Sequence, residues 1–241
     1  MGTMHSRLVL FFVTLAVWWG IGSHSAFAQR AEVGGNFLLG LPQNEFRDNV
    51  IDKGAGLSGN LGGFIENSPV MIGIDIGFLN YGSEGREEIF SETIPDVTVD
   101  VRTTNNILML HGFVRIQPQK GSLRPYVEGL YGFKYLFTRT TIRDNWFEDP
   151  IASSTNFDDL AASWGLGTGV DIKIWEGRRR GLHHKACDIS LNLSTRYLWG
   201  SKAEYLKEGS ITREPDGTLT YSVYRSRTDM LVPQFGLRFR F

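Results

Sequence analysis

Charged side chains and a histidine stand at alternate positions of otherwise apolar segments, where their natural chemistry is ion pairing and hydrogen bonding. The set comprises Asp75, His111, Arg115, Glu128, Lys134, Asp171, Lys173, Asp188, Arg196 and Arg238. Because an unpaired charge in an apolar environment is costly, we expect acids and bases to pair with one another across one shared interior.

Catalysis is the first alternative for these residues. His111 lies close to Arg115 and could act as the base for a serine nucleophile, as a lipid-modifying enzyme would require. The sequence contains serines, but none stands in a nucleophile motif. We therefore expect His111 to be a hydrogen-bonded structural residue, and we predict no enzyme.

Metal binding is the second alternative. His183, His184 and Cys187 form a small cluster, and histidine and thiol ligands suit zinc or copper. Their spacing matches no standard site, and three neighbouring arginines at 178–180 would repel a cation. The acidic segment Gly82–Thr104 lacks the regular acidic series of a calcium loop. We predict no metal site and no cofactor.

The elements that must position the charged residues are β-strands. Polar and apolar residues alternate with period two, which places them on opposite faces of a strand. Eight segments show this pattern: Ala31–Gly40, Gly56–Glu66, Val70–Asn80, Asn105–Pro118, Leu123–Phe137, Ala161–Trp175, Cys187–Gly200 and Thr228–Phe241.

The last of these segments has the clearest alternation. One face is apolar to its end and includes Phe235, Leu237, Phe239 and Phe241, whereas the other carries Arg238 and Arg240. Such a strand cannot lie between two apolar layers, because the arginines would be buried without water. It suits a sheet with an apolar medium on one side and a wet one on the other.

The connections between the segments alternate between short and long. Three connections are compact, namely Glu66–Pro69, Gln117–Ser122 and Trp175–Lys185. The other four, 41–55, 82–104, 138–159 and 201–227, are long and polar. This alternation is typical of an up-and-down barrel with one rim in a confined compartment. Ten strands are the alternative if the long loops contribute a hairpin. Ile94–Arg102 also alternates and is expected to extend its hairpin beyond the bilayer, and we expect a similar extension at Leu219–Arg225.

The apolar faces are predicted to contact lipid. Apolar faces without charge run along strands long enough to cross a bilayer when tilted. Aromatic residues near the strand ends would form interfacial girdles: Phe78, Tyr81, Phe137, Trp164, Trp175, Tyr197, Trp199 and Phe241. The charged faces then point inward, and eight strands leave room only for side chains, so we expect a filled interior.

Bulk composition and the N-terminus restrict the class further. The formal charge of −1 gives no indication of nucleic-acid binding. Residues 8–22 form an apolar run followed by Ala26-Phe27-Ala28, which predicts a signal peptide at 1–28 and a mature domain at 29–241. A single cysteine excludes an intrachain disulfide framework.

Taken together, the leader, the eight alternating strands, the alternating connections and the closing strand Leu231–Phe241 resemble small outer-membrane β-barrels of Gram-negative bacteria. The resemblance is to OmpA-type and opacity-type barrel domains, without a periplasmic domain. It implies that the barrel-assembly machinery reads Phe235, Leu237, Phe239 and Phe241. It also implies contact with outer-membrane lipids and lipopolysaccharide.

We therefore predict an all-β, eight-stranded antiparallel up-and-down transmembrane β-barrel in the outer membrane, with both termini in the periplasm. Its expected role is structural or interactive, and the long loops form the surface for a host or surface ligand. The alternatives are a soluble, secreted lipocalin-like carrier of an apolar ligand and a narrow outer-membrane channel.

Overall fold

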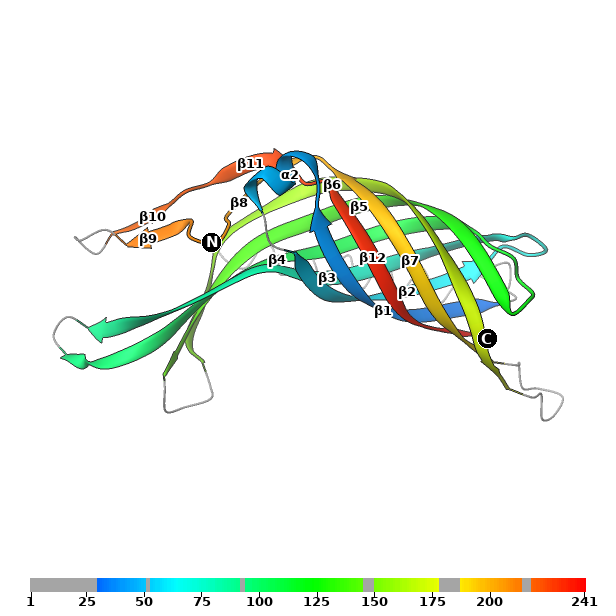
Figure 1. The fold of residues 1–241 in the computed structure, drawn as a ribbon, viewed down its shortest axis with the longest axis horizontal. Helices are drawn as coiled ribbons and strands as arrows, with labels where there is room; N and C mark the ends of the chain where they lie inside the picture. Colours follow the sequence, from blue (N-terminus) through cyan, green and yellow to red (C-terminus); the bar gives the residue numbers. More distant parts are fainter. Residues whose placement is uncertain (1–29, 51–52, 92–93, 145–149, 178–186, 214–217) are drawn as a thin grey trace, which may run out of the picture.

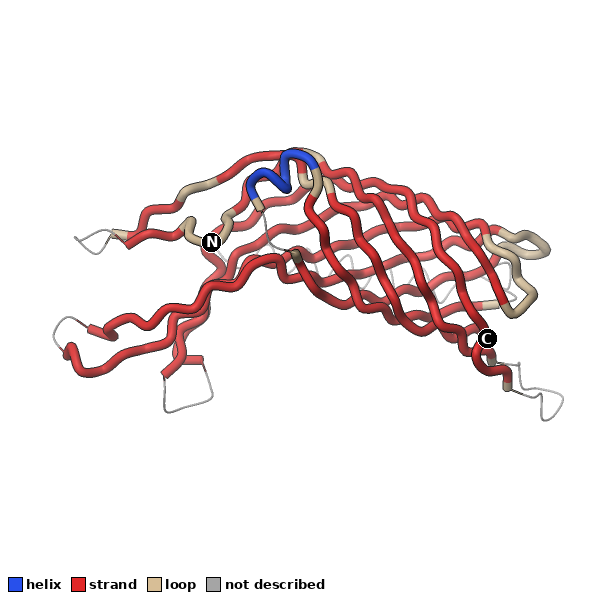
Figure 2. Tube along the Cα trace, in the orientation of Figure 1, coloured by secondary structure: helices blue, strands red, loops and turns tan. Residues whose placement is uncertain are grey.

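A computed structural model describes residues 30–50, 53–91, 94–144, 150–177, 187–213 and 218–241. The predicted signal peptide and its cleavage site lie outside the described residues. Most of the described chain is strand, and eight of the strands form a single barrel (Figures 1 and 2). No helix among the described residues has the length and apolar character needed to cross a membrane.

Eight strands form a closed antiparallel ring in the order β1-β12-β7-β6-β5-β4-β3-β2. Every strand pairs with its neighbours in the sequence, apart from the small strands β8–β11, and β12 closes the ring on β1. The ring strands are β1 (Ala31–Pro42), β2 (Gly54–Phe64), β3 (Val70–Ser91), β4 (Ile94–Ile116), β5 (Leu123–Asp144), β6 (Pro150–Glu176), β7 (Asp188–Gly200) and β12 (Met230–Arg240). The predicted fold class is confirmed.

The two ends of the barrel differ. The short connections 65–69 and 117–122 lie at one end, together with the seam where Phe241 donates its backbone N–H to the carbonyl of Ala31 (2.9 Å). We call this the short-turn end, and the opposite one the long-loop end. At the long-loop end, β3 to β6 run far beyond the ring (Figure 1).

Two of the predicted long loops are largely strand. The strands β3 to β6 contain 22 to 27 residues each, whereas a tilted strand needs about 9–11 to cross a bilayer. Residues 98–104 read Thr-Val-Asp-Val-Arg-Thr-Thr, and β-branched residues favour extended backbone. The alternation of Ile94–Arg102 therefore continues the β3–β4 hairpin, as predicted.

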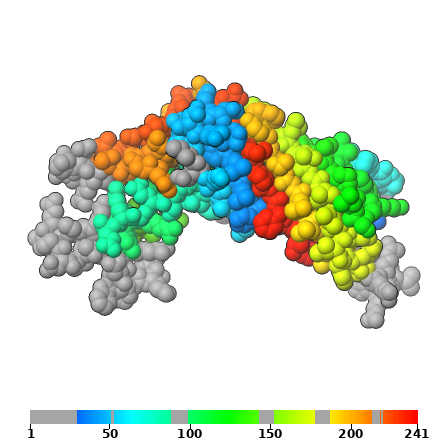
Figure 3. All heavy atoms as spheres, viewed as in Figure 1, coloured from blue at the N-terminus to red at the C-terminus, as the bar shows by residue number. Residues whose placement is uncertain are grey.

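The other two long connections fold over the long-loop end. The first contains the helix α2 (Asn44–Asn49), which the strand pattern did not predict. The second contains two small sheets, one of β8 (Lys202–Tyr205) with β11 (Tyr224–Arg227) and one of β9 (Ile211–Arg213) with β10 (Leu219–Tyr221). These strands stay outside the ring, so its strand number remains eight. In Figure 3, α2 lies beside β11 at this end.

Burial alternates along the ring strands as the sequence predicts, with apolar residues outward and polar residues inward. In β1, Val33, Phe37 and Leu39 are exposed on the outer wall, whereas Glu32 and Leu38 are buried. In β12, Phe235, Leu237 and Phe239 are exposed on the outer wall, whereas Gln234, Arg238 and Arg240 are buried. Phe241, which follows β12, is exposed as well. The barrel is therefore apolar outside and holds its charges inside.

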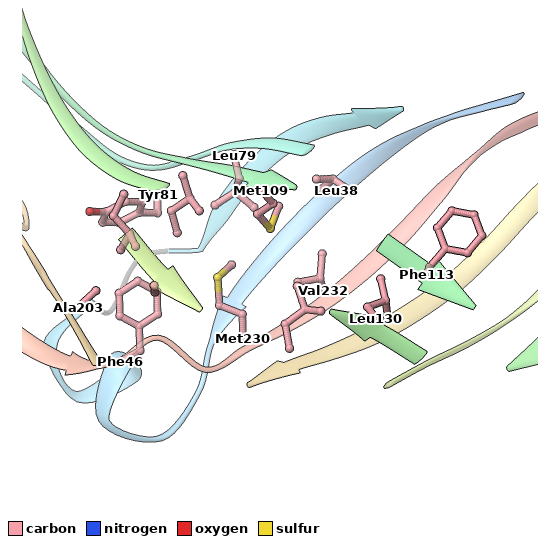
Figure 4. Packing of buried hydrophobic residues seen from close by; sticks show 14 of the residues in the cluster. Leu38, Phe46, Leu79, Tyr81, Met109, Phe113, Leu130, Ala203, Met230 and Val232 are labelled. Carbon is pink, nitrogen blue, oxygen red and sulfur yellow. The ribbon is translucent and has the colours of Figure 1, made fainter. Parts of the chain in front are cut away.

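The interior has two layers. The layer toward the short-turn end is polar and is described below. The layer toward the long-loop end is apolar and includes Leu38, Leu79, Met109, Met230 and Val232 (Figure 4). Sequence alternation indicated a polar inner face throughout, so this apolar layer is a difference from expectation.

Phe46 of α2 covers the apolar layer at the long-loop end of the barrel. Its ring packs edge-on against the ring of Tyr205, with 5.1 Å between the centroids. The centroid of the Tyr81 ring lies 5.9 Å away, and Figure 4 shows Phe46 and Tyr81 at the same end of the cluster. Tyr81 was predicted to belong to an outer aromatic girdle, and this prediction is wrong. Phe78 faces outward, so a residue three positions later points inward, and Tyr81 is buried.

Candidate functional site

The polar layer of the interior is the first candidate site, and Glu32 is one of its hubs. Its Oε1 lies 2.8 Å from Nη1 of Arg115 and 3.4 Å from Nη1 of Arg238. Its Oε2 accepts hydrogen bonds from Nε and Nη2 of Arg240 at 3.1 and 2.5 Å. One carboxylate from the first strand is thus shared by three guanidinium groups from β4 and β12.

Glu128 on β5 is the second hub. Its Oε2 accepts bonds from Nε and Nη2 of Arg115 at 2.9 and 2.8 Å, and its Oε1 accepts one from Nε of Arg196 at 2.7 Å. Arg196 also pairs with Oδ1 of Asp75 at 2.9 Å. The two-pronged geometry of arginine suits such bidentate sharing, which lysine cannot reproduce.

Asp171 on β6 completes the layer. Its Oδ2 accepts bonds from Nε2 of Gln117 at 2.5 Å and from Nη1 of Arg238 at 3.2 Å. Its Oδ1 accepts a bond from Nδ2 of Asn192 at 2.9 Å. All of these side chains are buried, so much of their hydrogen-bonding capacity is met by one another.

Tyr126 lies at the centre of this layer, between two arginines. The guanidinium carbons of Arg115 and Arg238 lie 4.4 and 4.7 Å from its ring centroid. Its hydroxyl accepts bonds from Nη2 of Arg238 at 2.7 Å and from Nδ2 of Asn192 at 3.0 Å. The ring therefore separates like charges while its face attracts both of them.

Two of the predicted residues, Asp188 and Lys173, lie at the short-turn rim and do not contact Glu32 or Glu128 in any ion pair of the described residues. Asp188 pairs with Nη2 of Arg124 at 3.0 Å, and its side chain is partly exposed. Lys173 donates to Oε2 of Glu176 at 2.6 Å, which lowers the pKa of that exposed carboxyl. Lys173 was predicted to join the interior network. It does not, because it lies at the end of β6 next to a register shift and pairs along its own strand.

His111 and Lys134 lie between the polar and apolar layers. Nε2 of His111 is 2.9 Å from Oγ of Ser163, and both residues are buried. The register places Asp75 opposite His111. Lys134 is fully buried and donates to the backbone carbonyl of Thr228 at 2.6 Å. A serine–histidine pair thus exists, but the barrel wall encloses it.

The structure adds residues to the network that the sequence-based set omitted. They are Glu32, Gln117, Arg124, Tyr126, Asn192 and Arg240. Each lies on the polar face of its strand, so alternation alone could have identified them. What alternation cannot show is that Glu32 and Arg240 are neighbours, because that requires the β1–β12 pairing.

The cluster of His183, His184 and Cys187, for which we predicted no metal, is only partly described. Cys187 is a free, half-buried thiol directly before β7, and His183 and His184 lie outside the described residues. Within the described ranges, no three His, Cys, Asp or Glu side chains are placed to hold a metal ion.

The outer wall of the barrel is the second candidate site. Large apolar side chains are exposed on all eight ring strands. Examples are Leu57, Ile72, Ile74, Val114, Val127, Leu166, Leu193 and Phe235. Exposed apolar patches of more than a few hundred Å² indicate an interaction surface, and here the surface encircles the molecule.

The third candidate is the sheet that β3 to β6 extend beyond the ring. It buries Val99 and Val101, and several of its described polar side chains are hydrogen-bonded across strands. Thr103 and Thr140 are 3.0 Å apart at their hydroxyls, and Asn156 donates to Thr140 at 2.6 Å. Arg139 donates to Ser153 at 2.6 Å. This part of the molecule has the composition of a water-exposed surface.

Known proteins offer similar folds at low sequence identity. No protein-family model matches the chain, and no curated protein matches its sequence. Among solved structures, Neisserial surface protein A (NspA) is 10% identical in sequence to this chain, with a TM-score of 0.39. The match covers 90% of this chain and 96% of the NspA chain. The N-terminal β-barrel domain of Pseudomonas aeruginosa OprF is 10% identical with a TM-score of 0.34, covering 89% and 99%.

A major outer membrane protein from Thermus thermophilus is 11% identical with a TM-score of 0.36, and the match covers 88% of this chain and 99% of that one. These structures are small outer-membrane barrels, the class of protein that the sequence resembles. The assignment of the barrel itself comes from the strand pairing of this chain.

Proposed function

We propose that this chain is an integral outer-membrane β-barrel protein of a Gram-negative envelope, with a structural or surface-interaction role. The observation that carries the proposal is the distribution of polarity. The outer wall is apolar around the ring, and the charges are paired inside. In water this arrangement would expose the apolar wall, whereas in a bilayer hydrocarbon covers it.

The polarity argues against the soluble carrier. A carrier of an apolar ligand lines its cavity with its apolar faces and turns its charges to water. Here Ile72, Ile74 and Leu193 face outward, and Asp171 and Arg196 face inward. A charge turned to lipid at mid-depth would cost roughly 2–4 kcal/mol, so the inward placement of every hub residue suits a membrane.

The role follows from the long-loop end. The ring acts as scaffold, and the extended β3–β6 sheet and the capping segments form the surface that meets a host or surface ligand. Both termini of the barrel then lie in the periplasm, and β3 to β6 project outside the cell. Outer-membrane lipids and lipopolysaccharide surround the wall.

We further propose that the barrel is not an enzyme. The serine–histidine pair of Ser163 and His111 is enclosed by the strands and lies beside a buried ammonium. Insertion would use the barrel-assembly machinery, which would read Phe235, Leu237, Phe239 and Phe241 on the outer face of β12. Nucleic acid is not an expected partner.

Cell fractionation combined with a mild detergent gel tests this proposal. We expect the protein in the outer-membrane fraction, released only by detergent, and we expect a change in migration after boiling, as a stable barrel shows. Recovery in the soluble periplasmic or extracellular fraction without detergent would overturn the proposal in favour of the carrier.

A further inference from the structure

The connection between β7 and β12 forms an arm of two parts at the long-loop end. Its base is the β8–β11 sheet, and its outer part is the β9–β10 sheet, which lies farther from the ring (Figure 1). Residues 206–210 and 222–223 join the two sheets and belong to no strand. Across this joint, Ser222 donates its backbone N–H to the carbonyl of Ser210 at 2.9 Å. The arm can therefore bend at the joint while both sheets keep their ladders.

The base of the arm is fixed to β6. Ser201, directly before β8, donates its backbone N–H to the carbonyl of Ala162 at 2.8 Å, and its Oγ accepts the N–H of Ala162 at 2.9 Å. Glu204 of β8 donates its backbone N–H to Oδ2 of Asp159 at 2.7 Å. The base is thus attached to a strand of the ring by main-chain groups, and it moves only with that strand.

The outer part is fastened to β3, beyond the point where β2 stops pairing with that strand. Four hydrogen bonds join the two segments, and in each of them the partners are 125 residues apart. They link Tyr81 with Leu206, Ser83 with Glu208, Glu84 with Gly209 and Arg86 with Ile211. The constant separation shows that residues 206–211 run parallel to β3. Every one of these bonds uses a side chain on one side, whereas the base is held by its backbone.

Glu84 and Glu208 form a reciprocal clasp within this contact. Oε1 of Glu208 accepts the N–H of Ser83 at 2.6 Å, and Oε2 of Glu84 accepts the N–H of Gly209 at 2.9 Å. Two glycines permit it: a Cβ on Gly82 would lie 3.2 Å from Cγ of Glu208, and Gly209 has a φ of +74°. Both bonds are exposed, so water competes for the donors and acceptors.

We propose that the outer part of the arm is a lid, hinged at the joint and held shut on β3 by the clasp. Leu206 at the hinge is fully buried, and its carbonyl accepts the hydroxyl of Tyr81, whose ring packs on Phe46. Lifting the lid breaks this bond and uncovers the aromatic end of the apolar inner layer. The lid thus controls how far that layer is open to the medium at the long-loop end. This inference goes beyond the proposed function.

Thiol labelling of the purified full-length protein in detergent micelles tests the proposal. Cys187→Ser removes the chain's single cysteine. Ser210→Cys then places a nearly isosteric thiol in the lid, and Ser226→Cys places one in the base; both serines are buried. A maleimide reagent measures how often each thiol becomes accessible. The clasp variant, Glu84→Ala with Glu208→Ala, should speed labelling of Ser210→Cys about tenfold and leave Ser226→Cys unchanged.

Glu87→Ala is the matched control. Glu87 is an exposed carboxylate three residues after Glu84 on β3, and the four bonds to the lid do not use it. Its removal should leave the labelling rate of Ser210→Cys as it is in the unmodified background. Equal rates with and without the clasp would overturn the proposal. So would equal acceleration of Ser210→Cys and Ser226→Cys, because the arm would then open as one piece.

The heat-modified gel shift of each variant separates this inference from the proposed function. A clasp variant that keeps the shift and is labelled faster supports a lid that moves on a folded ring. One that keeps the shift and is labelled no faster disproves the lid and leaves the membrane assignment intact. If the double variant loses the shift, Glu84→Gln replaces it. This change keeps an acceptor oxygen without the charge, so a smaller acceleration is expected, and no acceleration again disproves the lid.

Discussion

Glu32 and Arg240 stand opposite each other in the register of β1 and β12, and their side chains form a buried ion pair across the seam of the ring. They are 208 residues apart in the chain. The same carboxylate also pairs with Arg115 of β4. The seam is thus held by side chains as well as by the backbone ladder.

The first prediction concerns this carboxylate. Glu32→Gln removes the negative charge and leaves three buried arginines with too few acceptors. Removing one partner of a buried ion pair costs about 3–5 kcal/mol, so the free energy of unfolding should fall by about that amount. Urea unfolding in lipid vesicles measures it. Glu87→Gln, at an exposed residue of the extended sheet, is the control and should change little; an equal effect of the two variants would argue against the hub.

The second prediction concerns the outer wall. Ile74 is about half exposed and lies in the part of β3 that pairs with β2 within the ring, Met71–Asn80. Ile74→Arg should destabilise the folded barrel in a bilayer by roughly 2–4 kcal/mol, because the charge would face hydrocarbon. Ile74→Leu is the matched control. If Ile74→Arg unfolds at the same urea concentration as its control in vesicles, the wall does not face lipid.

The third prediction concerns the cap. Phe46 is fully buried against Tyr205 and Tyr81, and Arg47 beside it is exposed. Phe46→Ala loses packing worth about 3–5 kcal/mol in a fully packed site, so α2 should detach while the ring stays folded. Trypsin should then cut after Arg47 much faster, with the heat-modified gel shift retained. Phe46→Leu should give intermediate cleavage, and an unchanged rate in Phe46→Ala would contradict the packing.

The fourth prediction concerns conduction. Side chains of both layers fill an eight-stranded ring, whose width accommodates little else. Planar bilayer recordings of the folded protein should therefore show no steady unitary currents. The same preparation after heat unfolding is the control for nonspecific leakage. Reproducible unitary conductance from folded protein alone would establish the channel alternative.

The fifth prediction concerns catalysis. His111 and Ser163 are buried and hydrogen-bonded to each other within the wall. His111→Ala and Ser163→Ala should leave the lipid composition of the outer membrane unchanged, as measured by mass spectrometry of extracted lipids. A deacylated lipid present with the unmodified protein and absent with both variants would show that the pair is catalytic.

Much of the ring could be predicted from the sequence, because the alternation of polar and apolar residues along each strand indicates which side chains face the interior and which face outward. Val70–Asn80 alternates Ile72, Ile74 and Ile76 with Asp75, and the structure places these residues on opposite faces. The apolar end of the closing strand and the paired hub charges follow the same rule. In each case the information is local, since it depends on neighbours along one strand.

The remainder depends on contacts between distant segments. The partnership of Glu32 with Arg240 requires the ring to close, and alternation within either strand does not reveal it. The helix α2 is short and is held by Phe46 in a pocket formed by Tyr81 and Tyr205, which are far away in the chain. The apolar inner layer was not predicted, because each strand contributes only a few inward leucines or methionines. Their packing into one layer depends on the pairing of several strands.

The seam also constrains the order in which the molecule can be made. Until β12 has been delivered, Glu32 lacks two of its three arginine partners, and β1 presents a bare hydrogen-bonding edge. A nascent chain stopped before residue 230 therefore has no self-sufficient halfway state. We therefore expect the ring to close, and the Glu32 carboxylate to be fully paired, only once β12 has been added.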